Sequence, residues 1–426
     1  MSVRSKKKPS SEGFFYWVLS VQSVFCVTSG EVIGVAPCVV YSQKILLIPV
    51  YMARISRIVI THHQLPLEPP FPASWDTRPR TRFPATLVRV YDEDGRMGVG
   101  SGDAMLGFSD YEHLFIGQEA MELDRHHAIL MNIDFHGGRP WPLDIALWDL
   151  VGKTQGQAVW KMLGARAPRL RAYQSSGVHR SPDDMVGVAM RCLTAGIPAL
   201  KVRFGRSDLA KDLQVLHAIR EAVGDQLDLM VDCNQGWRMP WDTAPSWDLE
   251  HALHVAKALE KLGVFWMEEP LHRGDYEGMR TLRNRTGVRL AGAELTREPY
   301  EWRELLERDC LDVFQPDAAL TGGITGLAPF AREVGQRGRL FSSHTWGNGL
   351  GMMANLHLIA GTAGETYVEW PLDAPEWTPE RRDYLLASPL KLDNQGWFTL
   401  PEAPGLGIEL NEEMLEQTLS TTAKFH

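Results

Sequence analysis

Three acidic residues, each at the end of a short apolar run, are the part of this sequence best suited to chemistry. They are Asp232 in V-D-C-N-Q, Glu268 in W-M-E-E-P and Glu294 in A-G-A-E-L. Each run has the length of a buried strand, and a carboxylate buried without a partner is costly. Three carboxylates at neighbouring strand ends would suit Mg²⁺, which prefers oxygen ligands and leaves positions open for water or substrate. We therefore expect a magnesium site here, with buried salt bridges as the alternative.

The elements that must position these acids alternate regularly through the second half of the chain. We expect strands to end near Ser176, Arg203, Asp232, Glu268, Glu294, Asp317, His344 and Glu369. We expect helices over 182–195, 207–223, 248–262, 298–308 and 322–336. Repeated strand–helix units predict a closed parallel barrel with its chemistry at the C-terminal ends of the strands. The polar candidates all fall at those ends.

Residues 52–166 have the pattern of a smaller α+β domain. Alternating runs at 53–60 and 85–91 predict strands, and residues 142–161 have apolar positions at helical spacing. A long Pro-rich segment connects the two strands, and long loops inside compact domains are often functional. It carries four candidates for contact with a bound anion, namely Trp75, Arg78, Arg80 and Arg82. The alternative is a solvated loop with charged tips.

The first 51 residues differ from the rest. Lys6, Lys7 and Lys8 precede an apolar run over 14–28, which is the outline of a secretory signal. The run is too short and too polar for a transmembrane helix. Because Met52 opens a normal first strand, we expect residues 1–51 to be a spurious or disordered extension. A cleaved signal or a structural element is the alternative.

Composition and charge exclude several classes of protein. A formal net charge of −9 over 426 residues argues against nucleic acid as a partner. The five cysteines are scattered without a C-x-x-C pair, so neither a disulfide framework nor a zinc site is expected. We expect a cytoplasmic protein that does not enter membranes.

Seven motifs occur in one order along the second half of the chain: A-L-K-V-R, D-C-N, E-E-P, G-A-E, P-D, S-S-H and Y-V-E-W. Together they resemble the mandelate racemase subgroup of the enolase superfamily, and the resemblance covers nearly all of residues 52–413. It implies an α/β fold with a modified (β/α)7β barrel of the TIM type over 167–385. It also implies an N-terminal α+β capping domain over 52–166, completed by the C-terminal segment 386–426. The step shared by this family is Mg²⁺-assisted removal of a proton α to a carboxylate, which gives an enediolate.

The resemblance also implies roles for the residues of these motifs. The three acids named first hold Mg²⁺, and Asn234 orients a ligand or a water. His344 is the base, since an imidazole is matched to neutral pH, and Asp317 fixes its tautomer. Glu369 hydrogen-bonds to the substrate carboxylate opposite the metal, which requires a protonated side chain with a raised pKa. Lys201 pairs with that same carboxylate.

The chain departs from the family pattern at Arg203. Related racemases carry Lys-x-Lys there, and their second lysine is the base on the other face of the substrate. This chain has Lys201-Val202-Arg203, and a guanidinium is a poor base because its pKa is above about 12. A dehydration needs only one base. We therefore expect syn dehydration of a sugar acid, either an aldonate or an aldarate, to a 2-keto-3-deoxy acid.

Two other functions stay open. One is a racemase or epimerase of a 2-substituted carboxylic acid, and the other is a non-catalytic metal-binding sensor. The Asp317–His344 pair argues against the sensor, because an idle site has no need of an oriented base. The expected partner is a small carboxylate, and a homo-oligomer is expected because oligomers are common in this family.

Overall fold

The computed structural model describes residues 52–205, 208–364 and 366–426. The expectation for residues 1–51 lies outside the described residues. In the described ranges we find no helix that is both long and apolar enough to cross a membrane.

Eight parallel strands curl into the barrel that the sequence predicts. They are β4 (Arg169–Ser175), β5 (Ala199–Arg203), β6 (Asp228–Asp232), β7 (Trp266–Glu268), β8 (Arg289–Gly292), β9 (Val313–Phe314), β10 (Leu340–Phe341) and β11 (Tyr367–Pro371). Neighbours pair in chain order from β4 to β10, and β11 pairs with β4. Side chains link the remaining two edges: Ser342 Oγ donates to the carbonyl of Tyr367 at 2.6 Å, and Thr345 Oγ1 to that of Glu369 at 2.9 Å.

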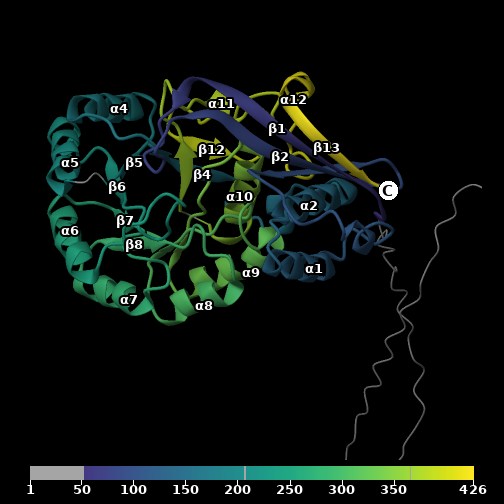
Figure 1. Cartoon of the computed structure of the whole chain (residues 1–426), viewed down its shortest axis with the longest axis horizontal. Coiled ribbons are helices and arrows are strands. Elements are labelled where there is room, and N and C mark those ends of the chain that lie inside the picture. Colours follow the sequence, from purple (N-terminus) through teal and green to yellow (C-terminus); the bar gives the residue numbers. More distant parts are fainter. Residues whose placement is uncertain (1–51, 206–207, 365) are drawn as a thin grey trace, which may run out of the picture. The chain divides into compact units, whose positions relative to one another are not determined.

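One main helix fills each of the seven intervals between these strands, which confirms the (β/α)7β arrangement. The helices are α4 (Pro182–Thr194), α5 (Leu209–Val223), α6 (Leu249–Lys261), α7 (Tyr276–Arg285), α8 (Pro299–Glu307), α9 (Gly323–Gln336) and α10 (Gly349–Thr362). Figure 1 shows α4 to α8 around the outside of the strands. Short polar side chains accept hydrogen bonds from backbone N–H groups at several helix starts, including Ser181, Asp208, Asp248, Asp275 and Asn348. Five of the helices agree with the predicted ranges within two residues, and α7 and α10 lie in strand-to-strand intervals for which no range was predicted.

The inside of the barrel has an apolar floor beneath a polar layer. The floor consists of the buried side chains of Tyr173, Ala199, Met230, Trp266, Ala291 and Val313. Because side chains on one face of a strand recur every second residue, Lys201, Asp232 and Glu268 lie one step further along β5, β6 and β7. All three are fully buried. The period of the strands therefore brings charged groups together at the C-terminal end of the barrel.

The capping domain is an antiparallel sheet with helices on it. Its strands are β1 (Ile55–Phe71), β2 (Arg80–Asp92), β3 (Met97–Gly102) and β13 (Leu419–Phe425), in the order β13-β1-β2-β3. Its helices are η1 (Glu112–Leu114), α1 (Leu123–Phe135), α2 (Trp141–Gln155) and α3 (Val159–Met162). The C-terminal strand β13 pairs with β1, so both ends of the described chain build this sheet. The remaining elements are α11 (Pro379–Arg382), β12 (Trp397–Thr399), which pairs with β4, and α12 (Glu412–Thr418).

The glycines of M-G-V-G-S-G allow α2 to lie directly on β3. A Cβ at Gly98 would lie 2.2 Å from the carbonyl oxygen of Ala146, and one at Gly100 would lie 2.0 Å from that of Pro142. Real Cβ atoms do not approach backbone this closely, so larger residues would push the helix from the sheet. This contact holds α2 against the sheet of the capping domain.

The connection between the first two strands is shorter than the sequence predicts. The Pro-rich segment continues β1 to Phe71 and begins β2 at Arg80, so only residues 72–79 remain outside the hairpin. Alternating side chains explain the difference, because Leu67 and Phe71 are buried in the core on one face of the extended strand. The prediction of a long loop was wrong, and the four candidate residues on it are therefore placed by a hairpin.

Candidate active site

The three acids predicted to bind metal come from adjacent strand ends. Asp232 and Glu268 are the last residues of β6 and β7, and Glu294 follows the end of β8 by two residues. A residue with left-handed backbone turns the chain after each strand: Asn234 has φ 48°, Glu269 has φ 46° and Ala293 has φ 82°. Such conformations are strained for residues other than glycine and concentrate at functional sites.

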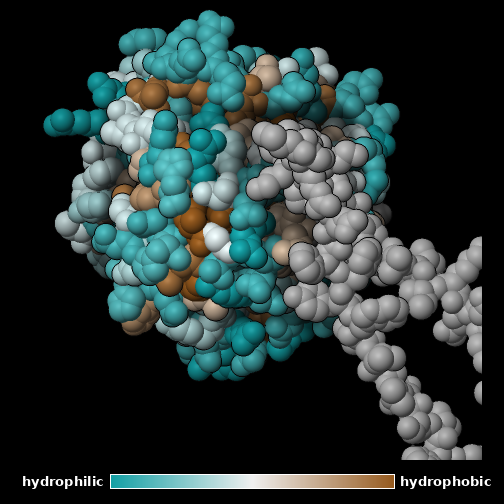
Figure 2. Space-filling model, turned by 90° about the vertical axis from the view of Figure 1, so that its right-hand side faces the viewer, coloured by the Kyte–Doolittle hydropathy of each residue, from teal (hydrophilic) through white to brown (hydrophobic). Residues whose placement is uncertain are grey.

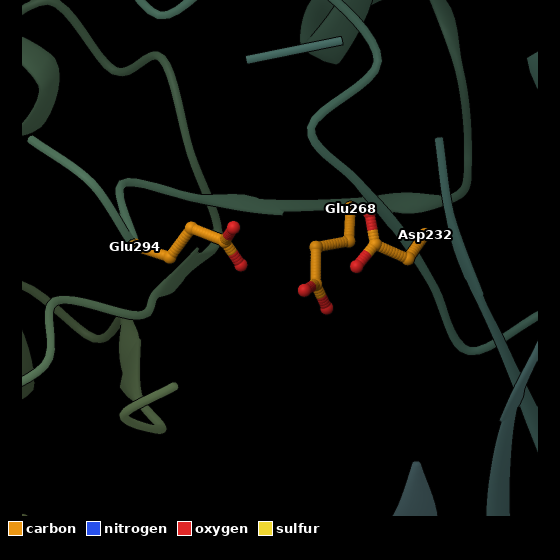
Figure 3. Close-up of side chains that lie close together, drawn as sticks. All are labelled: Asp232, Glu268 and Glu294. Carbon is orange, nitrogen blue, oxygen red and sulfur yellow. The ribbon is translucent and has the colours of Figure 1, made fainter. Parts of the chain in front are cut away.

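The carboxylates of these three acids point toward a common space, with Asp232 and Glu294 on either side of Glu268 (Figure 3). One oxygen from each lies within 4.8 Å of the others, and all three residues are buried. Burial and the neighbouring charge of Asp232 raise the pKa of Glu268 to about 8. Oxygen donors from three carboxylates match the ligands that Mg²⁺ prefers. The group is therefore suited to a divalent metal ion.

Lys201 lies among the carboxylates as a buried cation. Its Nζ is 2.6 Å from Glu268 Oε1, 2.7 Å from Glu369 Oε1 and 3.5 Å from Asp232 Oδ2. Burial by itself disfavours the charged amine, but Glu268 and Glu369 more than compensate and raise its pKa. Lys201 is therefore a fixed positive charge at neutral pH.

Arg203 is held by several contacts at the end of β5. Its guanidinium donates to Asp232 Oδ2 and, at 3.3 Å, to Asn234 Oδ1, while its Nε donates to the carbonyl of Ser176 at 2.8 Å. The guanidinium carbon lies 4.9 Å from the centre of the Trp75 ring and 5.6 Å from that of Trp346. Burial opposes the charge, but Asp232 and its acidic neighbours raise the pKa of Arg203. An arginine held in this way keeps its proton and acts as a donor.

His344 and Asp317 form the pair that the sequence predicts. They follow the ends of β10 and β9 by three residues each, and His344 Nδ1 is 3.0 Å from Asp317 Oδ2. The other ring nitrogen, Nε2, is 3.9 Å from Glu294 Oε2 and so faces the carboxylate cluster. Burial alone would lower the pKa of His344, but Glu294 and the hydrogen bond to Asp317 raise it to about 10. Without a metal ion this imidazole is therefore protonated at neutral pH.

Asp317 has a partner that sequence reasoning missed. Its Oδ1 accepts from Asn355 Nδ2 at 2.7 Å and from the backbone of Ala319 at 2.8 Å. Asn355 lies on α10, a helix that is buried along its whole length. A polar amide inside a largely apolar helix was the available signal. This contact orients Asp317 and, through it, His344.

Glu369 is ionised, which is the opposite of the raised pKa that the sequence predicted. Burial favours the neutral acid, but the positive charges of Lys201, His344 and Arg203 outweigh it and lower the pKa of Glu369 to about 2. Its Oε2 also accepts from the backbone N–H of Thr345 at 2.7 Å. Burial and nearby anions would raise the pKa of Glu369, as predicted, but the ion pair with Lys201 was not foreseen and lowers it.

The four candidates on the capping hairpin differ in what they contact. Trp75 contacts the guanidinium of Arg203, as described above, and so reaches the site. Arg80 forms an ion pair with Asp76. Arg78 is exposed, and Arg82 is exposed on β2 where it donates to Gln64 at 3.0 Å. Trp75 is therefore the candidate that contacts a residue of the site, and a role for the three arginines in binding an anion stays a prediction.

Comparison with known proteins gives consistent matches. A family model described as enolase C-terminal domain-like matches residues 184–414, which is more than half of the chain. L-talarate/galactarate dehydratase from Salmonella typhimurium is 28% identical over 362 residues, covering 81% of this chain and 85% of that protein. Arabinonate dehydratase from Saccharolobus solfataricus is 27% identical over 278 residues, covering 65% and 70%.

A solved structure agrees over most of the chain. L-talarate dehydratase from Polaromonas sp. JS666, complexed with Mg and L-glucarate, superposes with a TM-score of 0.75 at 25% identity and covers 87% of this chain and 99% of that one. Racemases and cycloisomerases also occur among the similar proteins. The chain is therefore similar to several enzymes that act on carboxylic acids, and dehydratases of sugar acids are prominent among them.

Proposed function

Because the chain belongs to the enolase C-terminal domain-like family of the enolase superfamily, we propose that it is a magnesium-dependent dehydratase of a sugar acid. One observation carries the choice of dehydration over racemisation. The oriented pair of His344 and Asp317 supplies one base, while Arg203, at the position of a second base, keeps its proton through its contact with Asp232. Elimination of water needs one base, and inversion at a carbon needs one on each face.

We assign the metal to Asp232, Glu268 and Glu294. They are buried and converge on one space, and their oxygens form the donor set that a hard divalent cation prefers. When bound, Mg²⁺ supplies a Lewis acid that stabilises negative charge developing on the substrate carboxylate. Lys201 supplies a second positive charge next to the same acids. We assign it to the substrate carboxylate, with Glu369 as its hydrogen-bonded neighbour and Asn234 as the group that orients Arg203.

His344 moves the proton in this proposal. Its Nδ1 is engaged by Asp317, so Nε2 is the atom that takes the α-proton and leaves an enediolate. The same nitrogen then returns the proton to the β-hydroxyl, which departs as water while the Cα–Cβ double bond forms. The resulting enol tautomerises to a 2-keto-3-deoxy acid. Asp317 stabilises the imidazolium between the two transfers, since it lies 3.0 Å from Nδ1.

A screen of sugar acids tests this function. Purified protein with Mg²⁺ is incubated with a panel of aldonic and aldaric acids, and 2-keto acid formation is followed as the semicarbazone. A product whose mass is lower by one water supports the proposal. Inversion without loss of water, seen by polarimetry, would indicate the racemase or epimerase that the relatives also allow. If no acid exchanges its α-proton with deuterium, the chain is a metal-binding protein without catalysis.

We predict that binding of Mg²⁺ releases protons at neutral pH. Glu268, with a pKa of about 8, and His344, with a pKa of about 10, both carry a proton in the metal-free protein at pH 7. A divalent charge beside them disfavours these protons, so about one to two should leave for each ion bound. Since protons compete with the metal, the affinity should rise with pH between about 6 and 9. A pH-stat measures the release, with NaCl of equal ionic strength as control, and a pH-independent affinity without release contradicts the prediction.

We predict that Arg203→Lys permits proton exchange from the second face of the substrate. An ammonium can lose its proton where a guanidinium cannot, although Asp232 will favour the charged form. Loss of the contacts with Trp75 and Ser176 should lower the dehydration rate about tenfold. Proton NMR in D₂O of a substrate and its C2 epimer follows exchange on both faces. If only one face exchanges in the variant, the lack of a second base is not what separates this chain from the racemases.

Self-association and a cytoplasmic location stay predictions. The capping domain carries several exposed apolar side chains, among them Met52, Leu106, Phe135 and Leu419. Figure 2 shows the face on which α1 and the C-terminus lie, where apolar patches alternate with a largely hydrophilic surface. A second copy of the chain would cover such patches, and light scattering after size-exclusion chromatography measures its presence.

A further inference from the structure

A cavity opens beside the carboxylate cluster on the side of β5 and β6. It has a volume of about 320 Å³. Its lining comes from residues 74–77 of the capping hairpin, from His179, from residues 204–205 after β5 and from most of residues 233–242 after β6. Trp237 joins the cavity to the cluster, because it lines the wall and its Nε1 donates to Glu294 Oε1 at 2.6 Å. A substrate whose carboxylate lies at the cluster would therefore extend the rest of its chain into this space.

The wall of the cavity is rich in indole rings. Trp75, Trp237 and Trp241 all line it, and Trp241 is 46% exposed, which places it at the rim. Ligand pockets combine such apolar surfaces with a few polar groups that fix orientation. Flat aromatic faces suit the C–H groups of an extended carbohydrate chain.

The charges around the cavity are already neutralised. Among the described residues that line it, Arg238 is the one guanidinium, and Asp242 Oδ2 lies 2.8 Å from its Nη1. Asp76, another lining residue, forms an ion pair with Arg80. A second carboxylate on the substrate would meet two acids here, and Arg238, the guanidinium in the described part of the wall, is already paired with Asp242. A buried charge in that position would be costly.

Several residues that line the cavity carry unsatisfied polar atoms. Ser74 Oγ, Asp76 Oδ1 and Arg238 Nε are buried and lack hydrogen-bond partners within the protein. They offer a hydroxyl, an acceptor and a donor respectively. Polar groups left in this state cost free energy until a partner arrives. Hydroxyl groups both donate and accept, so a polyhydroxy chain would supply all three partners.

We propose that this cavity receives the uncharged polyhydroxy end of the substrate, so that the substrate is an aldonate and not an aldarate. The inference rests on the proposed dehydratase function and makes it more specific. The aromatic wall, the paired charges and the unsatisfied atoms each favour hydroxyl groups over a second carboxylate.

The test compares aldonates with aldarates of the same configuration, which differ only at the far carbon. In the best pair, we expect kcat/KM for 2-keto acid formation to be at least about tenfold higher for the aldonate than for the aldarate. A factor of ten is about the size of one good charged contact, which the far carboxylate of the aldarate would lack in this cavity. A preference for the aldarate overturns the inference while the dehydratase function stands. If neither class is turned over, the dehydratase function fails. Binding of aldonates and aldarates is then measured by the quenching of tryptophan fluorescence. Tighter binding of aldonates supports the inference, and aldonate binding that is equal to or weaker than aldarate binding overturns it.

Asp242→Asn sharpens the comparison because it removes the charge that neutralises Arg238. The guanidinium then attracts an anion, so the ratio of aldonate to aldarate kcat/KM should fall about two- to fivefold, as expected for a partly exposed pair. Asp225→Asn is the matched control, since Asp225 is fully exposed between α5 and β6 at the other end of the barrel. Circular dichroism checks that both variants fold. An unchanged ratio in a folded Asp242→Asn overturns the assignment of this cavity to the far end of the substrate.

Discussion

Replacing His344 by asparagine is expected to reduce kcat at least about a thousandfold while leaving magnesium binding in place. Asparagine has no titratable nitrogen, so the α-proton loses its only oriented acceptor on that face. The residue is 9% exposed and its Nδ1 contacts Asp317, so an amide of similar reach can keep that hydrogen bond. Deuterium exchange at the α-carbon should disappear together with dehydration, since both begin with the same proton transfer.

The magnesium affinity of His344→Asn shows whether the variant has lost only its base or whether the structure of the metal site has changed as well. His344 Nε2 lies 3.9 Å from Glu294, so removal of the imidazolium should strengthen metal binding slightly by removing a competing positive charge. Isothermal titration with MgCl₂ measures this, and His113→Asn, an exposed position on the capping domain, serves as the matched control. Retained turnover in His344→Asn would assign the base to another residue. Loss of both metal and turnover would mean that His344 supports the fold of the site.

Local periodicity was sufficient to predict the barrel. Buried strands followed by amphipathic helices recur with caps at their starts, and these signals need only a few neighbouring residues. The range of α10 was not predicted, since this helix is buried on every side and lacks the polar face that marks the bounds of an amphipathic helix. The two strands of the capping hairpin were predicted, but their extension through the Pro-rich segment was not. Prolines there indicate a loop, whereas burial of Leu67 and Phe71 favours a strand.

The site could be predicted as a set of residues, but its electrostatics could not. Asp232 and Glu268 lie at strand ends, where the sequence placed them. The state of Glu369 depends on Lys201, which is 168 residues away in sequence (369 − 201) and 2.7 Å away in space. Contacts of this kind, like those of Asn355 and Trp237, arise only when the barrel curls and brings distant strands together.

Replacing Glu294 by glutamine is expected to remove activity and to stabilise the metal-free protein. A bound metal contributes several kcal/mol to the transition state, so loss of a ligand should lower kcat/KM about a thousandfold. Burial raises the pKa of Glu294 despite the opposing charge of His344, so its ionised form is disfavoured in the folded protein. Such a group contributes stability below its unfolded pKa of about 4.5, and this stability is lost as pH rises through the folded pKa. Glutamine avoids that loss, and differential scanning calorimetry of metal-free protein at pH 5 and pH 8 measures it.

The size and the pH dependence of the change in Tm show whether Glu294→Gln acts by removing a buried charge or by changing the packing. Glutamine can keep the hydrogen bond that Glu294 Oε1 accepts from Trp237, so little contact energy is lost. At pH 8 the Tm of the metal-free variant should exceed that of the wild type by about 2 °C, with a smaller difference at pH 5. Added Mg²⁺ should raise the Tm of the wild type and leave that of the variant unchanged. Glu307→Gln, an exposed change on α8, should shift neither value. A variant less stable than the wild type at pH 8 would show that the charge of Glu294 stabilises the fold. The three acids would then form a set of salt bridges, and not a metal site that destabilises the metal-free protein.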